Sequence, residues 1–173
     1  MKKNLISMAI AVAAVLSAAN TFAEDGTVNF TGEITDTACT VDIGANNTMT
    51  VDLGKVARTA FTGVGSKASA TKFVLKLKDC PTGLNLARVK FDGTGYDGDD
   101  SVLKLTQDLG AAQGVAIELS DPAAKLPLFT PSTAYALVEG DNALNFYARY
   151  VQMAQTVVSG PANASATFTL NYN

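Results

Sequence analysis

Residues 164–173 read ASATFTLNYN, and this stretch decides the fold class. Apolar side chains occupy every second position, and Ser, Thr and Asn lie between them. A period of two is typical of a β-strand with one buried face. The strand runs to Tyr172 with almost no polar tail. Because an apolar edge strand is an aggregation hazard, we expect a neighbour beside it, either within a complete sandwich or from another chain.

The same alternation recurs along the chain. It covers residues 48–53, 72–78 and 145–150, and turn-forming residues such as Gly, Asn, Asp and Pro separate these runs. Helix signals are weak, with one possible turn at residues 57–60. Short alternating strands between turns predict an all-β protein, most simply a β-sandwich.

Residues 1–23 have the three parts of a secretory signal peptide. Lys2 and Lys3 form a basic head, residues 5–19 are mostly apolar, and Ala23 ends a stretch suited to cleavage. A membrane anchor is the alternative, but a span needs about 20 apolar residues and this run is shorter. We therefore expect export through the periplasm and a mature chain of 150 residues, which is the size of one domain.

Composition argues against several classes of function. The mature chain carries 11 basic and 16 acidic side chains, without a cluster of Lys or Arg, so it is poorly suited to nucleic acid or anionic lipid. His is absent, which removes the commonest general base and zinc ligand. Residues 92–100 are acidic but lack the closing Glu of an EF-hand, and we interpret them as a solvated loop. We expect no enzyme activity, metal or cofactor.

The two cysteines, Cys39 and Cys80, are predicted to form a disulfide, because the chain is exported and their number is even. Two unpaired buried thiols are the alternative.

Residues 24–35 also alternate, although they lie at the start of the mature chain. One face carries Gly26, Val28, Phe30 and Gly32, followed by Ile34. The segment could be the first strand of its own sandwich. The two glycines favour a second interpretation, in which the segment is pressed into a tight groove, because Gly often marks the close approach of another backbone.

Several segments in order resemble the single-domain pilins of the chaperone–usher pathway, especially the type 1 fimbrial major subunit family. They are DGTVNFTGEI at residues 25–34, ACTV at 38–41, FVLKLKDC at 73–80, ARY at 148–150 and ATFTLNY at 166–172. The family's penultimate Tyr and its Gly fourteenth from the end fall here on Tyr172 and Gly160. The resemblance covers nearly all of the mature chain.

The resemblance implies an incomplete immunoglobulin-like β-sandwich lacking its final strand, formed by residues 36–173 and completed by a donor strand. Residues 24–35 would be the N-terminal donor-strand extension, with Gly26, Val28, Phe30 and Gly32 on its inserted face. The acceptor edge, which a periplasmic chaperone would also contact, would comprise five residues: Gly160, Ala166, Phe168, Leu170 and Tyr172. Neighbouring pilin subunits and an outer-membrane usher would be the other partners, and the product would be an extracellular fimbria on a Gram-negative cell, supporting adhesion.

Two alternatives remain at this point. A minor or adaptor pilin of the same system would share the fold and the strand exchange. A periplasmic ligand-binding sandwich, from a different class, would be complete and monomeric without any partner.

Overall fold

The computed structural model describes residues 26–32 and 38–173. The predicted signal peptide at residues 1–23, and residues 24–25 and 33–35 of the predicted donor extension, lie outside this part. The chain divides into two units, Met1–Ile34 and Thr35–Asn173, and each is described by itself. Within the first unit, residues 26–32 belong to no helix or strand.

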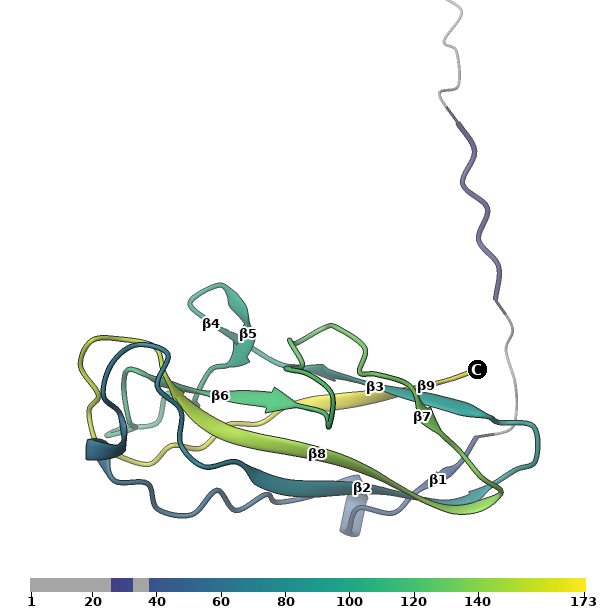
Figure 1. Cartoon of the computed structure of the whole chain (residues 1–173), viewed down its shortest axis with the longest axis horizontal. Coiled ribbons are helices and arrows are strands. Elements are labelled where there is room, and N and C mark those ends of the chain that lie inside the picture. Colours follow the sequence, from purple (N-terminus) through teal and green to yellow (C-terminus); the bar gives the residue numbers. More distant parts are fainter. Residues whose placement is uncertain (1–25, 33–37) are drawn as a thin grey trace, which may run out of the picture. The chain divides into compact units, whose positions relative to one another are not determined.

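The second unit, called the body below, contains two antiparallel sheets (Figure 1). The larger sheet has the strand order β1-β2-β8-β6-β5-β4 and the smaller sheet the order β7-β3-β9. The strands of the larger sheet are β1 (Thr40–Val41), β2 (Thr71–Cys80), β4 (Gly95–Tyr96), β5 (Asp99–Leu103), β6 (Val115–Ser120) and β8 (Gly140–Gln152). Those of the smaller sheet are β3 (Leu86–Asp92), β7 (Tyr135–Ala136) and β9 (Thr167–Tyr172). Two short 3₁₀ helices, η1 (Ala45–Asn47) and η2 (Arg58–Ala60), lie between β1 and β2.

An aromatic cluster joins the two sheets. Phe146 on β8 stacks on Phe73 of β2 with ring centroids 5.7 Å apart, and it meets Phe91 of β3 edge-on at 5.3 Å. Offset and edge-to-face contacts of this kind add about 0.5–1.5 kcal/mol each beyond the burial of the rings. The sandwich core is therefore organised around β2, β3 and β8.

The all-β prediction is confirmed, and so are two of the predicted strands. Residues 72–78 lie in β2, and residues 145–150 lie in β8. β6 was not predicted, because its residues VAIELS do not alternate: both faces of this central strand are buried. None of the helices in the described residues is long and apolar enough to cross a membrane.

Three expectations need correction. The run at residues 48–53 belongs to no sheet, and β9 starts at Thr167 rather than at residue 164. The acidic loop at residues 92–100 is not simply a loop, because it contains the β4–β5 hairpin. Its turn places Asp97 and Gly98 at positive φ, a conformation that Asp and Gly tolerate well.

Candidate functional site

One edge of β9 has no neighbouring strand in the described part of the chain, where β9 pairs only with β3. Leu86 and Asn173 exchange two main-chain hydrogen bonds, at 3.1 and 3.0 Å. In an antiparallel pair, such doubly bonded positions alternate with positions whose N–H and C=O point away from the partner. Phe168, Leu170 and Tyr172 fall on these alternate positions, so their main-chain groups face the open edge.

The same three residues turn their side chains toward the interior but stay partly exposed. Opposite them on β3, Ala87 and Val89 are fully buried and Phe91 is 5% exposed. Phe168, Leu170 and Tyr172 pack on this core without being covered by it. β9 therefore presents unpaired main-chain groups and incompletely buried apolar side chains along one line.

Residues 48–56 form the opposite wall. Met49 and Leu53 pack half-buried against the core, Val51 between them is also half-buried, and Thr50 and Asp52 are exposed. No main-chain hydrogen bond joins residues 49–56 to another residue that the structure describes. The predicted strand at residues 48–53 is wrong for this physical reason: the alternation is present, but the segment has no strand to pair with.

A groove of about 1520 Å³ lies between β9 and this wall. Its floor is formed by apolar side chains of the larger sheet and of β3: Phe73, Leu75, Phe91, Leu103, Ile117, Leu119 and Ala148. Such a groove suits an extended peptide, which could bond to an exposed strand edge while burying alternate side chains.

Two tyrosines fix the walls of the groove. The Tyr150 hydroxyl donates a hydrogen bond to the main-chain oxygen of Ala162, 2.9 Å away, and this ties the segment before β9 to β8. Burial raises the pKa of the Tyr172 hydroxyl, an effect that a hydrogen bond from the Cys39 main chain partly offsets. Tyr172 of β9 therefore lies near Cys39, which comes just before β1.

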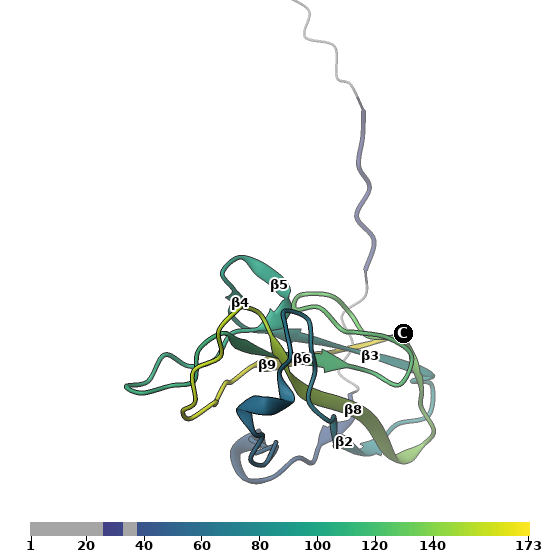
Figure 2. The ribbon, with the colours of Figure 1, turned by 60° about the vertical axis from the view of Figure 1, so that its left-hand side comes forward.

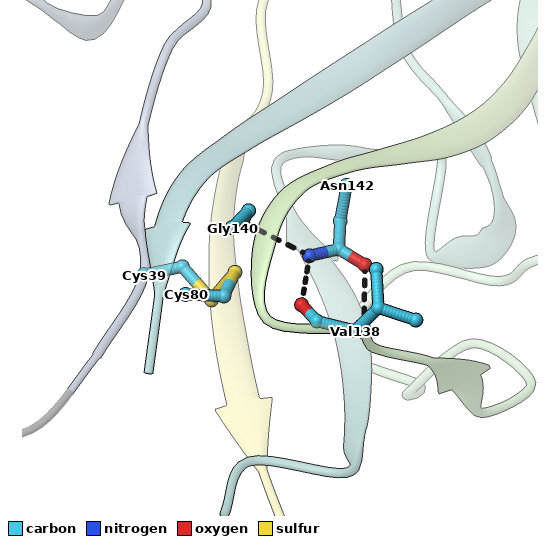
Figure 3. Close-up of a disulfide and its surroundings, with 5 residues drawn as sticks. All are labelled: Cys39, Cys80, Val138, Gly140 and Asn142. Carbon is cyan, nitrogen blue, oxygen red and sulfur yellow. Dashed lines mark hydrogen bonds between the residues drawn. A yellow bond between two sulfur atoms is a disulfide. The ribbon is translucent and has the colours of Figure 1, made fainter. Parts of the chain in front are cut away.

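The predicted disulfide is present and lies at that end of the groove. Cys39 and Cys80 are bonded, and Figure 3 shows the pair beside the turn that leads into β8. The disulfide therefore joins the residue just before β1 to the end of β2.

The five predicted acceptor residues occupy different positions. Phe168, Leu170 and Tyr172 lie in β9, and Ala166 immediately precedes it. Gly160 also lines the groove but lies outside the strand, packed on the neighbouring loop. A Cβ there would overlap the main-chain oxygen of Gly110, so the close approach of the two loops requires glycine.

On the predicted donor face, Val28 and Phe30 are 75% and 92% exposed. A Cβ added at Gly26 or Gly32 would meet no atom within 4 Å. Nothing in the described part of the free chain therefore explains why these two positions are glycine.

The acidic segment offers no ligand set. Asp97 bonds the Lys104 ammonium at 2.8 Å, and Asp99 accepts a hydrogen bond from the Ser101 main chain at 2.8 Å. Among the residues that the structure describes, no group of three His, Cys, Asp or Glu side chains is placed to hold a metal ion. The geometry of the body points to peptide binding by strand addition.

Sequence reasoning missed one wall of this site. Ile43, Met49, Val51, Leu53 and Phe61 all contribute apolar surface to the groove. The alternation at residues 48–53 was visible, but it was interpreted as an ordinary paired strand. After residue 53, no second alternating run occurs before residue 71. This long gap was the available signal that residues 48–53 lack a neighbouring strand.

A sandwich with an open strand edge and an apolar groove defines a strand-accepting protein. The family model described as "Fimbrial protein" matches residues 28–173. Long polar fimbria protein A of Salmonella typhimurium is 37% identical, covering 99% of this chain and 97% of its own. The probable major fimbrial subunit LpfA of Escherichia coli O157:H7 is 37% identical over 86% of this chain and 84% of its own.

A chain from the structure of a chaperone–usher pilus superposes with a TM-score of 0.68 at 19% identity, covering 87% of this chain and 96% of that one. The chain belongs to the fimbrial protein family. It is a pilin, a subunit of a surface fimbria of Gram-negative bacteria, with the immunoglobulin-like fold that lacks one strand. The predicted family and fold class are therefore confirmed.

Proposed function

We propose that this pilin polymerises by donor-strand exchange, in which residues 24–35 of one copy fill the groove of the next. The observation that carries the proposal is the free edge of β9. Its unpaired main-chain groups and half-covered side chains belong to the same residues, Phe168, Leu170 and Tyr172.

The donor segment has the matching pattern. Val28 and Phe30 are exposed and lie two positions apart, as do the inward-facing residues of a strand. Burying them would contribute about 1.5–3 kcal/mol each. Gly26 and Gly32, on the same face, would let the donor backbone approach the groove floor closely.

The remaining steps follow from an open groove in an exported chain. A signal peptide at residues 1–23 would direct the chain to the periplasm, where a chaperone would cover Phe168, Leu170 and Tyr172. An outer-membrane usher would then allow the next subunit's segment to replace the chaperone. The mature chain would comprise the donor extension and the domain at residues 36–173. In the fibre, the chain would act as a structural subunit that supports adhesion rather than as an enzyme.

We place the chain in the shaft of the fimbria. A chain with both an open groove and a donor segment can add copies of itself without limit, and its relatives include a probable major subunit. The number of copies per fibre tests this placement. Many copies along the whole length would support it, and one or a few would instead indicate a minor or adaptor pilin.

Phe30→Asp tests the exchange itself, with Thr31→Asp as the matched control. Phe30→Asp would place an unpaired charge on the apolar floor, so we expect it to abolish fimbriae seen by electron microscopy. Thr31→Asp puts the same charge on the opposite face of the segment and should leave fimbriae largely intact.

The chaperone-bound subunit should accumulate normally in both variants, because neither residue belongs to the acceptor groove. Normal fimbriae from Phe30→Asp cells, or equal losses from both variants, would contradict the proposed donor role. Deleting residues 24–32 provides a second test, and fimbriae built from that variant alone would also exclude the exchange.

A further inference from the structure

Five of the seven large apolar side chains exposed on the described part of the body lie at its two ends, and the other two are Val56 and Phe129. In Figure 1, β8 runs from the end that carries the C-terminus to the opposite end, whose loops come forward in Figure 2. Val64, Leu109 and Val158 lie in the loops at the second end, here called the loop end, and are all at least 45% exposed. Leu86 and Val138 lie at the first end, here called the disulfide end.

Hydrogen bonds place these residues. Gly63 and Gly65, on either side of Val64, bond to Gln152 at the end of β8. Val158 exchanges two main-chain bonds with Gln113. Leu109 belongs to the adjoining turn, in which the Ala111 N–H bonds the Asp108 oxygen. The three apolar side chains therefore lie on neighbouring loops.

Hydrogen bonds also fix the apolar residues of the disulfide end. Asn142 accepts a hydrogen bond from the Val138 N–H at 2.9 Å, and it donates to the main-chain oxygens of Val138 and Gly140 at 2.7 and 3.2 Å (Figure 3). Leu86 bonds Asn173 at the end of β9. Because its turn is fixed by these bonds, Val138 is presented to solvent without needing to be ordered on binding.

Donor-strand exchange would bring these two ends together. Every ladder in the body is antiparallel, so we take the donor segment to run antiparallel to β9. Its C-terminal end then lies where β9 begins, which is the loop end of the acceptor. Three residues, 36–38, connect it to Cys39, and the four Cα–Cα steps from residue 35 can span at most about 14 Å. The disulfide end of the donor body must therefore lie close to the loop end of the acceptor.

The charges of the two ends are also complementary. The disulfide end carries the exposed carboxylates of Asp79, Glu139 and Asp141, whereas exposed Lys55 and Arg58 lie on and beside η2 at the loop end. None of these five side chains forms an ion pair with another residue in the described ranges. Asp108 is a carboxylate of the loop end, and exposed Lys78, which pairs with Asp42, lies near Asp79 and Asp141, so the match is partial. Complementary charges of this kind favour one orientation of a contact.

We propose that the loop end of each subunit docks on the disulfide end of the following copy, with Leu109 and Val158 covering Val138 and Leu86. This contact rests on the proposed strand exchange and is additional to it. The connecting residues hold the two ends at a high effective concentration, so a small apolar contact is enough to order the joint.

Leu109→Asp and Val138→Asp test the contact, with Phe129→Asp as the control. Phe129 is about half exposed but lies on the loop between β6 and β7, away from both groups. Fibres are assembled from each variant, and the rate of subunit release in guanidinium chloride is measured. We expect release to be about tenfold faster for Leu109→Asp and Val138→Asp, here called the end variants, and unchanged for Phe129→Asp. Each end variant replaces an apolar side chain that the proposed contact would bury with a charged one.

A synthetic peptide of residues 24–35 separates this contact from the strand exchange, because it fills the groove without bringing a second body. Its affinity for the mature chain should be the same in wild type and both end variants, which also shows that the variants fold. Wild-type release rates from both end variants, or equal acceleration by Phe129→Asp, would overturn the contact. Failure of the wild-type chain to bind the peptide would instead contradict the proposed exchange.

Discussion

β2 and β9 have the same alternation of apolar and polar side chains, but they bury their apolar faces to different extents. In β2, Leu75 and Leu77 are 2% and 0% exposed, and the strand has β1 and β8 as neighbours. In β9, Phe168 and Leu170 remain half-covered, and β3 is the only neighbour within the described residues. The pattern of a strand therefore specifies which face turns inward, whereas the neighbouring strands determine whether that face is covered.

This difference explains how one sequence can encode both a stable core and an interface. A partner side chain could fill a pocket, but the groove also leaves main-chain groups of β9 and of residues 49–56 without strand partners. Only another backbone can satisfy both kinds of group at once. The missing component of the sandwich is thus a strand.

The largest effect is expected from the disulfide, which fixes the end of β2 and lies near Tyr172 of β9. Replacing Cys39 and Cys80 together with Ser should lower the free energy of unfolding by about 4 kcal/mol, because the bond closes a loop of 41 residues. This loss is measured by guanidinium unfolding of the body with the peptide of residues 24–35 bound in its groove, here called the peptide-filled body. A midpoint equal to that of the oxidised wild type would show that the disulfide is dispensable.

Leu77→Ala and Leu170→Ala compare the two strands directly. In the peptide-filled body, both should cost about 2–5 kcal/mol, as expected for buried leucines. With the groove empty, Leu77→Ala should cost the same, but Leu170→Ala only about 1–2 kcal/mol, because part of its side chain is already in water.

Denaturation of each variant in dilute solution, with and without the peptide of residues 24–35, gives the four values. The distinction between β2 and β9 would fail if Leu170→Ala cost as much as Leu77→Ala in the empty body. It would also fail if the peptide left the cost of Leu170→Ala unchanged.

The sequence predicted local features, such as which side chains of a strand turn inward. It did not predict which strands lack a neighbour. Alternation correctly predicted strands over residues 72–78 and 145–150, because the local order of apolar and polar residues indicates which side chains face inward and which face outward. It failed at residues 48–53, where the same pattern forms a groove wall without a ladder. It also gave no hint that Gly160 packs on Gly110, because a contact between distant loops has no local periodicity.

The smallest expected effect on stability comes from the buried carboxylate of Glu118 in the larger sheet. Glu118 on β6 is 2% exposed, with Arg149 of β8 at 3.0 Å and Lys67 at 2.9 Å. Its burial favours the neutral acid, but hydrogen bonding and charge from Lys67, with Arg149 and Lys125, outweigh that effect and lower the pKa of Glu118. A lowered pKa in the folded state stabilises the fold above the ordinary carboxyl pKa, and this stability is lost as the pH falls through the folded value.

Glu118→Gln should therefore cost about 1.5 kcal/mol at pH 7, a modest loss because the cations remain partly hydrated. The cost should shrink as the pH falls from the ordinary carboxyl pKa through the lowered pKa of folded Glu118, where this side chain becomes protonated. Unfolding of the peptide-filled body between pH 3 and pH 7 measures this, and Glu139→Gln on the exposed turn serves as the control. A cost that stays constant across that range would mean that Glu118 stabilises the sheet without its charge. The burial of Glu118 in β6 would then depend only on the shape of its side chain. β6 and β9 would differ only in the number of their neighbouring strands.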